Sequence, residues 1–539
     1  MMNRLFSASL GVLALLLAAQ PALAFQAPAA NASGVVKAPL RTTGEAYRPA
    51  YHFTPPGQWM NDPNGLVYYK GQYHLFYQHY PAGNVWGPMH WGHAVSKDMV
   101  HWQDRPIALA PDAHGLIFSG SAVVDWNNAS GLGTKANPPL VAIYTYHNEK
   151  FKEAGLTYPQ SQGIAYSTDA GETWHKYKGN PVLVPPEGKP DFRDPKVMWH
   201  PASKSWIMTL AVGDHTEFYR SSDLKSWSFL SAFGKEIGAH GGVWECPDLL
   251  PMKVKETGET KWVLIQSLNP GGPNGGSATQ YFVGDFDGRD FKLDPKYAAQ
   301  LSAKGPQWLD WGRDNYAGVT WSDVPKADGR TLMMGWMNNW DYGQVVPTTA
   351  WRGAMTLPRE LTLHFDGTNY LVKSEPAVEV DRLKGRTYTS VPQTVSEALA
   401  VDMPAKSVMQ SSIDVQFAKP ADGTMAYLEL SNDAGDIYKI GYDATANSFF
   451  SDRRKSGLVD FSDKFAASVH SAPRNVAADV IDMKVFVDHD SIELFADGGA
   501  TALTDTLYPR KPYTSLRFVA GGKSVQVLKM QVTELKDAF

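Results

Sequence analysis

The stretch Ser96-Lys97-Asp98-Met99-Val100-His101-Trp102 decides the fold that the sequence predicts, because two variants of it follow. They are Ser167-Thr168-Asp169-Ala170-Gly171-Glu172-Thr173-Trp174 and Ser222-Asp223-Leu224-Lys225-Ser226-Trp227. Each unit is typical of a strand end, a turn that contains Asp, and a Trp that opens the next strand. Repeats of about one four-stranded blade predict a β-propeller, and their uneven spacing leaves a β-sandwich open as the alternative.

The surrounding residues predict an all-β chain. Leu66–Tyr69, the turn Lys70-Gly71 and Gln72–His79 have the alternation of a β-hairpin. From about Tyr51 onward, strand-like runs are separated by Gly, Pro, Asn and Asp, and no long stretch has helical period. The chain contains 17 Trp, 24 Tyr and 23 Phe. We expect most of them in sheet cores, and some Trp residues in a sugar site, because indole faces pack on sugar rings.

The chain changes character near Ser374-Glu375-Pro376, which predicts a second domain. Its 539 residues exceed what one hydrophobic core usually holds, about 250–300 residues. No Trp follows Trp351, whereas alternating strand-like runs continue. These runs are 413–417, 426–430, 437–442, 485–488, 491–496, 515–519 and 525–532. They predict a separate β-sandwich at 385–539, joined by a linker at 371–384 to a first β domain at 46–370.

The N-terminus is typical of a secretory signal peptide, predicted at 1–24. Arg4 supplies the positive charge, Leu10–Ala19 is a short apolar run, and Ala22-Leu23-Ala24 is a cleavage pattern. About ten apolar residues are too few to span a bilayer, and a retained membrane anchor is the alternative. Residues 25–45 are predicted to form a flexible leader. We therefore expect a secreted protein, extracellular or periplasmic.

The composition predicts a soluble globular protein that binds neither nucleic acid nor a membrane. Hydrophobic residues make up 43% of the chain and charged residues 19%, and the net charge of −5 is small for this length. The single cysteine, Cys246, leaves no partner for an intrachain disulfide. A lone cysteine is usually a small buried hydrophobe, which is what we expect here. The oligomeric state is not indicated.

Three carboxylates stand in unusual local sequences. Asp62 lies in Trp59-Met60-Asn61-Asp62-Pro63-Asn64-Gly65, Asp194 in Phe192-Arg193-Asp194-Pro195, and Glu245 in Trp244-Glu245-Cys246-Pro247-Asp248-Leu249. The proline after Asp62 and Asp194 favours extended backbone at both aspartates. For each of the three taken singly, the alternative interpretation is an ordinary carboxylate in a turn or on the surface.

Cleavage of a ketosidic bond would use such carboxylates. The reaction needs a carboxylate beside the anomeric carbon, a proton donor beside the leaving oxygen, and negative charge near an oxocarbenium-like transition state. We expect Glu245 to stay protonated through burial beside Trp244 and two nearby aspartates. Asp62 needs the reverse, namely Asn and backbone donors that keep it ionised.

Together the three segments resemble the hallmark motifs of glycoside hydrolase family 32, the family of invertases, levanases and inulinases. Other segments are also similar to that family, and the resemblance covers about residues 48 to 535. They are Phe76-Tyr77-Gln78-His79, His90-Trp91-Gly92-His93, Phe118-Ser119-Gly120-Ser121-Ala122 and Asp490-Ser491-Ile492-Glu493-Leu494-Phe495. The resemblance implies a five-bladed β-propeller at 46–370 that carries the active site, followed by a β-sandwich.

The resemblance also implies roles for individual residues. Asp62 would be the nucleophile, Glu245 the general acid/base, and Asp194 would bind fructose hydroxyls and stabilise the transition state. The implied substrate-binding residues are Trp59, Asn61, Gln78, Trp86, Ser121, Arg193 and Trp340. Ordinary propeller packing is the alternative for these pocket residues.

No cofactor or metal is expected. His90 and His93 have an H-x-x-H spacing but lack an adjacent Glu or Cys ligand. The intact Asp62 and Trp59 of the first motif favour an exo-acting hydrolase of levan- or inulin-type fructans within the resembled family. An invertase-like sucrose hydrolase and a fructosyltransferase are the alternatives, and a fructan-binding protein without activity is disfavoured by the three intact carboxylates.

Overall fold

The computed structural model describes residues 41, 44–186, 188–189 and 191–539. The predicted signal peptide at 1–24 and most of the predicted leader at 25–45 lie outside the described residues. Within the described ranges, no helix combines the length and the apolar character needed to cross a membrane.

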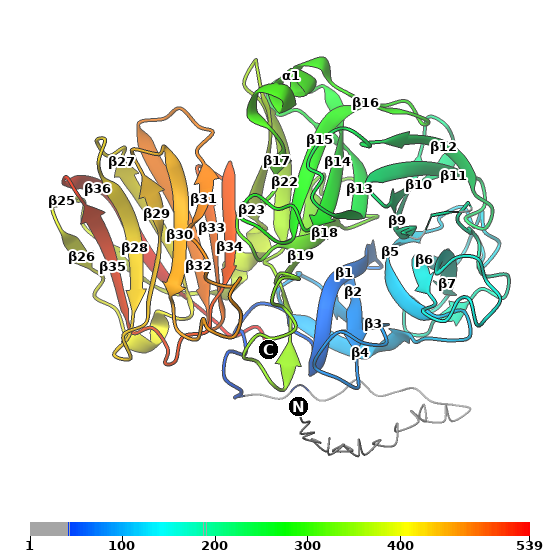
Figure 1. Ribbon diagram of the computed structural model, residues 1–539, viewed down its shortest axis with the longest axis horizontal. Helices are drawn as coiled ribbons and strands as arrows, with labels where there is room; N and C mark the ends of the chain where they lie inside the picture. The colour runs from blue at the N-terminus through cyan, green and yellow to red at the C-terminus, as the bar shows by residue number, and fades with distance from the viewer. Residues whose placement is uncertain (1–40, 42–43, 187, 190) are drawn as a thin grey trace, which may run out of the picture. The chain divides into compact units, whose positions relative to one another are not determined.

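Five sheets, here blades I to V, follow one another around a ring, and their strands are antiparallel except for the short β20 of blade I (Figure 1). Blade I contains β1 (Gln58–Tyr69), β2 (Gln72–Tyr80), β3 (His90–Ser96), β4 (Trp102–Leu109) and β20 (Trp351–Arg352). Blade II contains β5 (Leu116–Val124), β6 (Leu140–His147), β7 (Gln160–Ser167) and β8 (His175–Lys176). Blade III contains β9 (Arg193–His200), β10 (Ser205–Val212), β11 (His215–Ser221) and β12 (Ser228–Phe233).

The remaining two blades complete the ring. Blade IV contains β13 (Val243–Lys253), β14 (Thr260–Asn269), β15 (Ala278–Phe286), β16 (Phe291–Leu293) and β17 (Gln307–Trp308), with α1 (Pro295–Lys304) between the last two. Blade V contains β18 (Tyr316–Thr320), β19 (Thr331–Met337), β21 (Ala354–Met355), β22 (Arg359–Phe365) and β23 (Tyr370–Pro376). The late strand β20 pairs in parallel with β1 of blade I, so a distant part of the chain closes the ring.

The repeat that predicted the propeller marks the turn between the third and fourth strands of blades I to III. In each turn a serine hydroxyl bonds an aspartate carboxylate two residues later. These hydrogen bonds join Ser96 to Asp98 (3.1 Å), Ser167 to Asp169 (2.7 Å) and Ser221 to Asp223 (3.0 Å). The third unit therefore begins at Ser221 and not at the predicted Ser222, because the residue two before the aspartate makes the turn.

The C-terminal part is a β-sandwich of two sheets. The seven-stranded sheet contains β24 (Lys384–Ser390), β25 (Gln393–Val395), β27 (Ser411–Ala418), β32 (Val480–Asp488), β33 (Ser491–Ala496), β34 (Thr501–Thr506) and β36 (Val525–Leu535). The six-stranded sheet contains β26 (Ala398–Ala400), β28 (Met425–Ser431), β29 (Ile437–Asp443), β30 (Ser448–Lys455), β31 (His470–Pro473) and β35 (Ser515–Gly521). Two 3-10 helices, η1 (Val378–Leu383) and η2 (Ala405–Ser407), precede or interrupt these strands. The predicted all-β fold, a five-bladed propeller followed by a β-sandwich, is confirmed.

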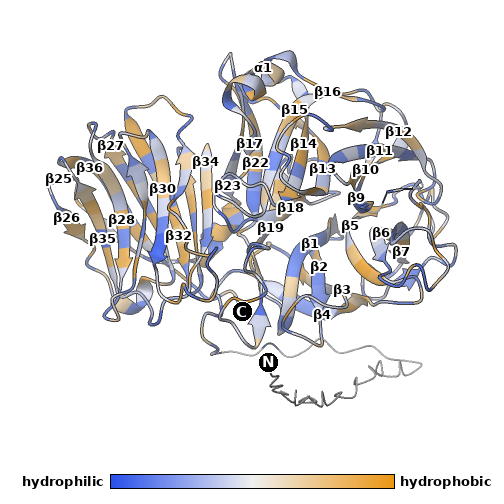
Figure 2. Cartoon of the chain, in the orientation of Figure 1, coloured by the Kyte–Doolittle hydropathy of each residue, from blue (hydrophilic) through white to orange (hydrophobic). Residues whose placement is uncertain are grey.

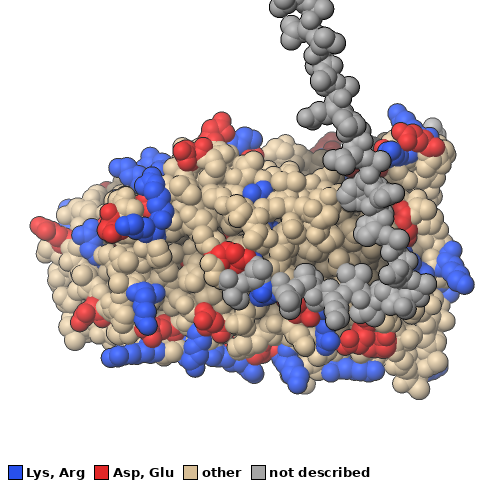
Figure 3. Space-filling view, turned by 90° about the horizontal axis from the view of Figure 1, so that it is seen from below, with Lys and Arg blue, Asp and Glu red and all other residues tan. Residues whose placement is uncertain are grey.

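Alternation of apolar and polar residues builds the sandwich core (Figure 2). On β27, Ile413, Val415 and Phe417 are fully buried, whereas Asp414 and Gln416 between them face outward. Because successive side chains of a strand point to opposite faces, this period-2 pattern buries one face of each sheet against the other. On the face shown in Figure 3, positive and negative side chains are interspersed over a mostly uncharged surface.

A buried ionic network joins the propeller and the sandwich. Arg359 on β22 is inaccessible to solvent and donates to Asp310 (2.8 Å), to Thr504 (2.7 Å) and to Glu493 on β33. The imidazole of His52 bonds the same Glu493 and also Asp488, each at 2.8 Å. Buried charges are tolerated when they are paired and hydrogen-bonded, and here the pairs cross from one part to the other.

Candidate active site

A cavity of about 390 Å³ opens among the innermost strands of the propeller. These strands, β1, β5, β9, β13 and β18, contact one another in cyclic order around the ring axis. Eight of the predicted site residues line the cavity, namely Asn61, Asp62, Gln78, Trp86, Arg193, Asp194, Glu245 and Trp340. Six further residues line it, namely Phe118, Ser119, His147, Gln160, Asp191 and Gln344. The structure thus brings carboxylates from three blades to one site.

Every innermost strand is interrupted by a shift of register beside the cavity. The shifts lie between Met60 and Pro63, Ile117 and Gly120, Arg193 and Lys196, Glu245 and Asp248, and Tyr316 and Val319. A β-bulge re-aims the side chains next to it, which is why bulges are common at active sites. In three of the five strands the bulge contains proline, whose missing N–H cannot continue the hydrogen-bonded ladder.

The backbone at Asp194 differs from the prediction. Its φ is 63°, in the left-handed region, although the proline that follows predicted extended backbone. Cys246, in the equivalent stretch of β13, has a φ of 48°. Non-glycine residues rarely adopt this conformation, and they do so mostly at functional sites where the surrounding structure imposes it. The bulge of each strand, and not the local preference of the residue, decides the conformation here.

Asp62 is held by side-chain donors from two blades. Ser119 on β5 donates to Oδ2 at 2.6 Å, and the Asn61 amide donates to Oδ1 at 3.0 Å. Burial raises the pKa of Asp62, the Ser119 hydrogen bond lowers it, and the charge of Glu245 raises it again. The predicted donors are therefore present, but burial outweighs them and the net shift is upward.

Asp194 lies in a strongly perturbing environment. Burial and the charges of Glu245 and Asp62 raise the pKa of Asp194 to about 7, against the opposing effect of Arg193. Its Oδ2 accepts the backbone N–H of Cys246 at 3.1 Å. The Cys246 thiol is buried and lies 3.8 Å from Asp62 and 3.7 Å from Asp194. Asp62 and Asp194 therefore share one small apolar neighbour.

Both oxygens of Glu245 are hydrogen-bonded. Arg193 donates to Oε1 at 3.0 Å, and the Tyr316 hydroxyl donates to Oε2. The prediction that Trp244 lies against this carboxyl is wrong, because the Trp244 indole donates to Ala239 at 3.0 Å and packs beside Phe282. Adjacent residues of a strand face opposite sides, so Trp244 enters the blade core while Glu245 faces the cavity.

Trp59 and Gln78 support and line the cavity in different ways. Trp59 is fully buried below it, donates from its indole to Asn61 at 2.7 Å, and packs with Trp340 at a ring separation of 5.9 Å. Trp59 therefore acts on the site through Asn61 and Trp340. The amide nitrogen of Gln78 is buried without a hydrogen-bond partner among the described residues. Because a buried donor normally has a partner, this nitrogen is available to a ligand.

Ser121 lies outside the cavity. Its hydroxyl donates to the Pro195 carbonyl at 2.9 Å and accepts the Val197 N–H at 3.0 Å, so it joins β5 to β9. The serine that reaches the cavity is Ser119, in the same predicted segment. A regular strand would direct both serines to one face, and the register shift between Ile117 and Gly120 separates them.

No group of His, Cys, Asp and Glu residues in the described part of the chain is arranged to hold a metal ion. His90 and His93 do not converge. The Nδ1 of His90 faces the Pro88 carbonyl at 2.9 Å, whereas the ring of His93 stacks on Phe76 with 4.2 Å between centroids. Their spacing in the sequence therefore reflects sheet packing.

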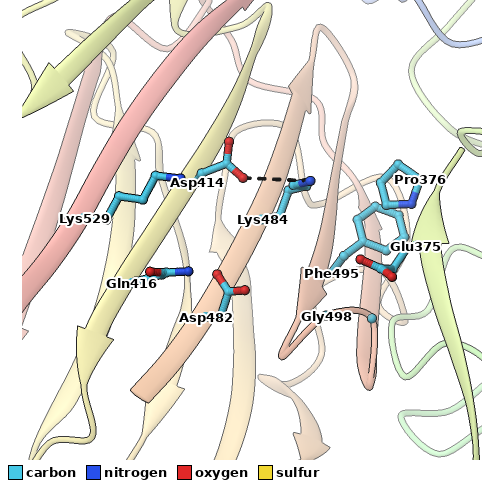
Figure 4. Close-up of a pocket in the computed structure, with 10 residues that line it drawn as sticks. Glu375, Pro376, Asp414, Gln416, Asp482, Lys484, Phe495, Gly498 and Lys529 are labelled. Carbon is cyan, nitrogen blue, oxygen red and sulfur yellow. Dashed lines mark ion pairs between the residues drawn. The ribbon is translucent and has the colours of Figure 1, made fainter. Parts of the chain in front are cut away.

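A second cavity, of about 220 Å³, lies on the seven-stranded sheet of the sandwich (Figure 4). Asp414 on β27 lies directly opposite Lys484 on β32, which pairs with β27 in a regular register, and 4.0 Å separates the charged atoms. Asp482 and Gln416 form the next cross-strand pair on the same face of the sheet. Opposite charges on these regular strands offset one another, so we place the chemistry in the propeller cavity.

Comparison with known families and proteins gives a consistent result. The model described as "Glycosyl hydrolases family 32 N-terminal domain" matches residues 52–374, and that described as "Glycosyl hydrolases family 32 C terminal" matches residues 379–534. A levanase of Bacillus subtilis is 44% identical over 520 residues, which are 96% of this chain and 73% of the relative. An extracellular exo-inulinase of Aspergillus awamori is 37% identical over 92% of this chain and 96% of the relative.

Solved structures are similar over almost the same length. The crystal structure of the exo-inulinase from Aspergillus awamori has a TM-score of 0.82 and 35% identity, covering 92% of this chain and 100% of the other. A fructofuranosidase from Schwanniomyces occidentalis, complexed with fructose, has a TM-score of 0.80 and 32% identity, covering 91% and 98%. Both similarities extend through the propeller and the sandwich.

Proposed function

This chain belongs to glycosyl hydrolase family 32, and from that premise we propose that it releases terminal fructose from β-fructans by a retaining double displacement. The observation that carries the proposal is the convergence of Asp62, Asp194 and Glu245, from three blades, on one cavity. The chain is a glycoside hydrolase acting on β-fructofuranosides, like the levanase and the exo-inulinases that it resembles.

In the first step Asp62 attacks C2 of the terminal fructosyl unit. The C2–O bond to the rest of the substrate breaks, Glu245 gives its proton to the leaving oxygen, and a fructosyl ester of Asp62 forms. Ser119 and Asn61 orient the Asp62 carboxylate, because each donates to a different oxygen. Both donors are fixed on the propeller before substrate arrives, so little reorganisation is needed.

In the second step water replaces the leaving group. Glu245, now ionised, takes a proton from the water as its oxygen attacks C2, and the ester bond to Asp62 breaks to release fructose. Tyr316 donates to one oxygen of Glu245 and Arg193 to the other, which holds the carboxyl in place in both steps. Burial excludes bulk water around Asp194, and Asp62 beside it is partly buried, which strengthens electrostatic interactions in the cavity.

Asp194, Arg193 and Gln78 recognise the hydroxyls of the fructosyl unit in this proposal. The Gln78 amide nitrogen has no partner among the described residues, so a sugar hydroxyl satisfies it. Asp194 supplies acceptors and, when ionised, negative charge close to the oxocarbenium-like transition state. Trp340 and Trp86 offer flat apolar faces at the wall of the same cavity.

We further propose that the enzyme acts from the chain end and outside the cytoplasm. Relatives that are similar over nearly their whole length carry the names exo-inulinase and extracellular exo-inulinase. The N-terminal segment typical of a signal peptide supports export. Sucrose contains the same terminal fructosyl bond and is expected as a second substrate.

The purified protein should release fructose from levan, inulin and sucrose, measured against glucose and against short oligofructans over time. An exo-acting enzyme produces fructose from the first minutes and no oligofructans from the polymers. Early oligofructans would indicate internal cleavage, and excess glucose from sucrose would indicate transfer of fructose to another sugar. Absence of fructose from all three substrates would remove the proposed activity.

A further inference from the structure

The cavity has a buried floor and a more accessible rim. Asn61, Gln78 and Asp194 on the floor keep 6% or less of their surface exposed. His147, at the end of β6, is partly exposed and lines the rim, and the side chain of Asp191 beside it is 36% exposed. A terminal fructosyl unit that reaches the catalytic carboxylates occupies the floor, so the next sugar must lie at the rim.

His147 is built into an ordered cluster at this rim. Its imidazole stacks on Phe118 with ring centroids 4.3 Å apart and planes 12° from parallel. Phe118 in turn meets Trp86 edge-on at 6.1 Å. All three rings line the cavity, so this wall presents aromatic surface of the kind that packs on the C–H face of a sugar ring.

Hydrogen bonds determine which imidazole nitrogen carries the proton. The Phe192 backbone N–H can only donate, and it donates to Oε1 of Gln160 at 2.7 Å. The Gln160 amide therefore turns its Nε2–H₂ toward Nδ1 of His147, 3.4 Å away. Since that nitrogen must accept, the proton of the neutral ring is on Nε2.

The neutral form is the one present at ordinary working pH. Burial and the neighbouring Arg193 guanidinium lower the pKa of His147 to about 4, with Asp191 opposing. The rim thus offers one fixed N–H donor without a positive charge. The Asp191 carboxylate, bonded to Arg193 through Oδ1, supplies acceptors next to it.

We propose that His147, backed by Phe118 and oriented by Gln160, binds the sugar on the leaving-group side of the scissile bond. This inference rests on the proposed function and adds to it a residue that discriminates between leaving groups. The ligand is a neutral polyhydroxylated ring, because the site combines a flat face, one neutral donor and a carboxylate acceptor. Arg193 connects the rim to the chemistry, since it bonds both Asp191 and Glu245.

The test compares two substrates that differ only beyond the scissile bond. Methyl β-D-fructofuranoside has methanol as its leaving group, and an inulin-type trisaccharide has a disaccharide. For His147→Ala we expect kcat/KM on the trisaccharide to fall about tenfold, mostly through KM, because one hydrogen bond and one stacking face are lost. The kcat/KM of His147→Ala on the methyl fructoside should stay within about twofold of that of the unaltered protein.

His147→Phe keeps the flat ring and removes the donor, so its loss on the trisaccharide should be smaller than that of His147→Ala. If the alanine variant does not fold, the phenylalanine variant still tests whether His147 binds the leaving-group sugar. The matched control is His114→Ala, because His114 packs on Tyr146 of the same blade with 5.1 Å between centroids but does not line the cavity. The His114→Ala control should change kcat/KM on neither the trisaccharide nor the methyl fructoside.

An equal loss on both substrates, or no loss on the trisaccharide, would overturn this assignment of His147. That result differs from a failure of the proposed function, in which the unaltered protein would release fructose from neither substrate. The ratio of the two kcat/KM values within each variant also cancels any difference in the fraction of folded protein.

Discussion

The Ser119 hydroxyl, on the innermost strand of blade II, donates a 2.6 Å hydrogen bond to Oδ2 of Asp62 on the innermost strand of blade I. The bond crosses between two blades and ends on the proposed nucleophile. It opposes the effect of burial, which by itself raises the pKa of Asp62. The reactivity of Asp62 thus depends on a residue from a neighbouring blade.

Ser119→Ala should therefore move the acidic limb of the kcat/KM profile to higher pH. Loss of the hydrogen bond raises the pKa of Asp62, so a higher pH is needed to ionise the nucleophile. We expect about a tenfold loss at the original optimum. Ser121→Ala is the control, since Ser121 bonds only the backbone of β9 in the described structure. An unchanged acidic limb in Ser119→Ala would contradict this role.

Asp62→Ala should abolish turnover while leaving the fold intact. Without the carboxylate no fructosyl ester forms, and the cavity loses only a side chain at its lining. Fructose release and the thermal midpoint should be measured together, with the exposed Asp285→Asn as the control. Residual activity within about tenfold of the unaltered enzyme would show that another group is the nucleophile.

Glu245→Gln should slow the hydrolysis of sucrose and fructans by about 10²–10⁴-fold. The loss should be smaller for a nitrophenyl fructoside, because a good leaving group needs little help from a general acid. Tyr316→Phe removes the hydroxyl that bonds Glu245 and should give a milder loss of the same selectivity. Equal losses on both kinds of substrate would argue against the acid role of Glu245.

Asp194→Asn should make the protein more resistant to heat at neutral and alkaline pH. Burial raises the pKa of Asp194 to about 7 from a usual value near 3.8, so between these values the folded chain holds a proton that the unfolded chain lacks. The contribution of this group to stability is complete below about pH 4 and is lost as the pH rises to about 7.

The asparagine side chain is neutral at every pH and avoids that loss. Thermal midpoints of Asp194→Asn and the unaltered protein should differ by about 2–4 °C at pH 8 and converge near pH 4. Inactivity of the variant does not interfere with this measurement. A difference that grows toward low pH would mean that the carboxylate is ionised at pH 4 in the folded protein.

Arg359→Met should strongly destabilise the whole chain. It leaves the buried Asp310 without its cation and the buried Glu493 with His52 alone, and breaking a buried pair in this way costs roughly 3–5 kcal/mol. The control is Arg517→Met, which removes a half-exposed guanidinium from Glu429 and should cost about 0–1 kcal/mol. Urea denaturation of both variants measures the difference. Similar midpoints would show that the network between propeller and sandwich contributes little.

Residues 385–539, produced alone, should fold as a sandwich and release no fructose, because all three carboxylates lie in the propeller. The fragment also leaves Glu493 and Asp488 without Arg359 and His52, so it should melt below the full chain. Circular dichroism and a fructose assay check both points. Fructose release by the fragment would overturn the location of the active site.

Much of the fold could be predicted from local patterns. The turn units around Asp98 and Asp169, together with period-2 alternation, indicated a propeller and a sandwich. Both features could be predicted because turns and the faces of strands depend on residues that are close in the sequence. The resemblance of the three carboxylate motifs to one family added the number of blades. The start of the third turn at Ser221 was missed because Ser221 and Ser222 are adjacent and only the turn geometry separates them.

Side chains of the site were harder to predict than its carboxylates. Ser119 was passed over for Ser121, and His147, Gln160 and Tyr316 carried no motif of their own. Their importance comes from bulges and from neighbours on other blades, which no local pattern records.

By itself, the sequence determined the carboxylates and the prolines beside them, because the chemistry of a side chain and the missing N–H of proline are properties of the residue and do not depend on the fold. The tertiary structure alone decided which groups meet. Ser119 reaches Asp62, Tyr316 reaches Glu245, and Trp244 turns away from Glu245. The physical reason is that a register shift of one residue reverses the side a strand residue faces, and closing five blades in a ring sets which of those sides converge.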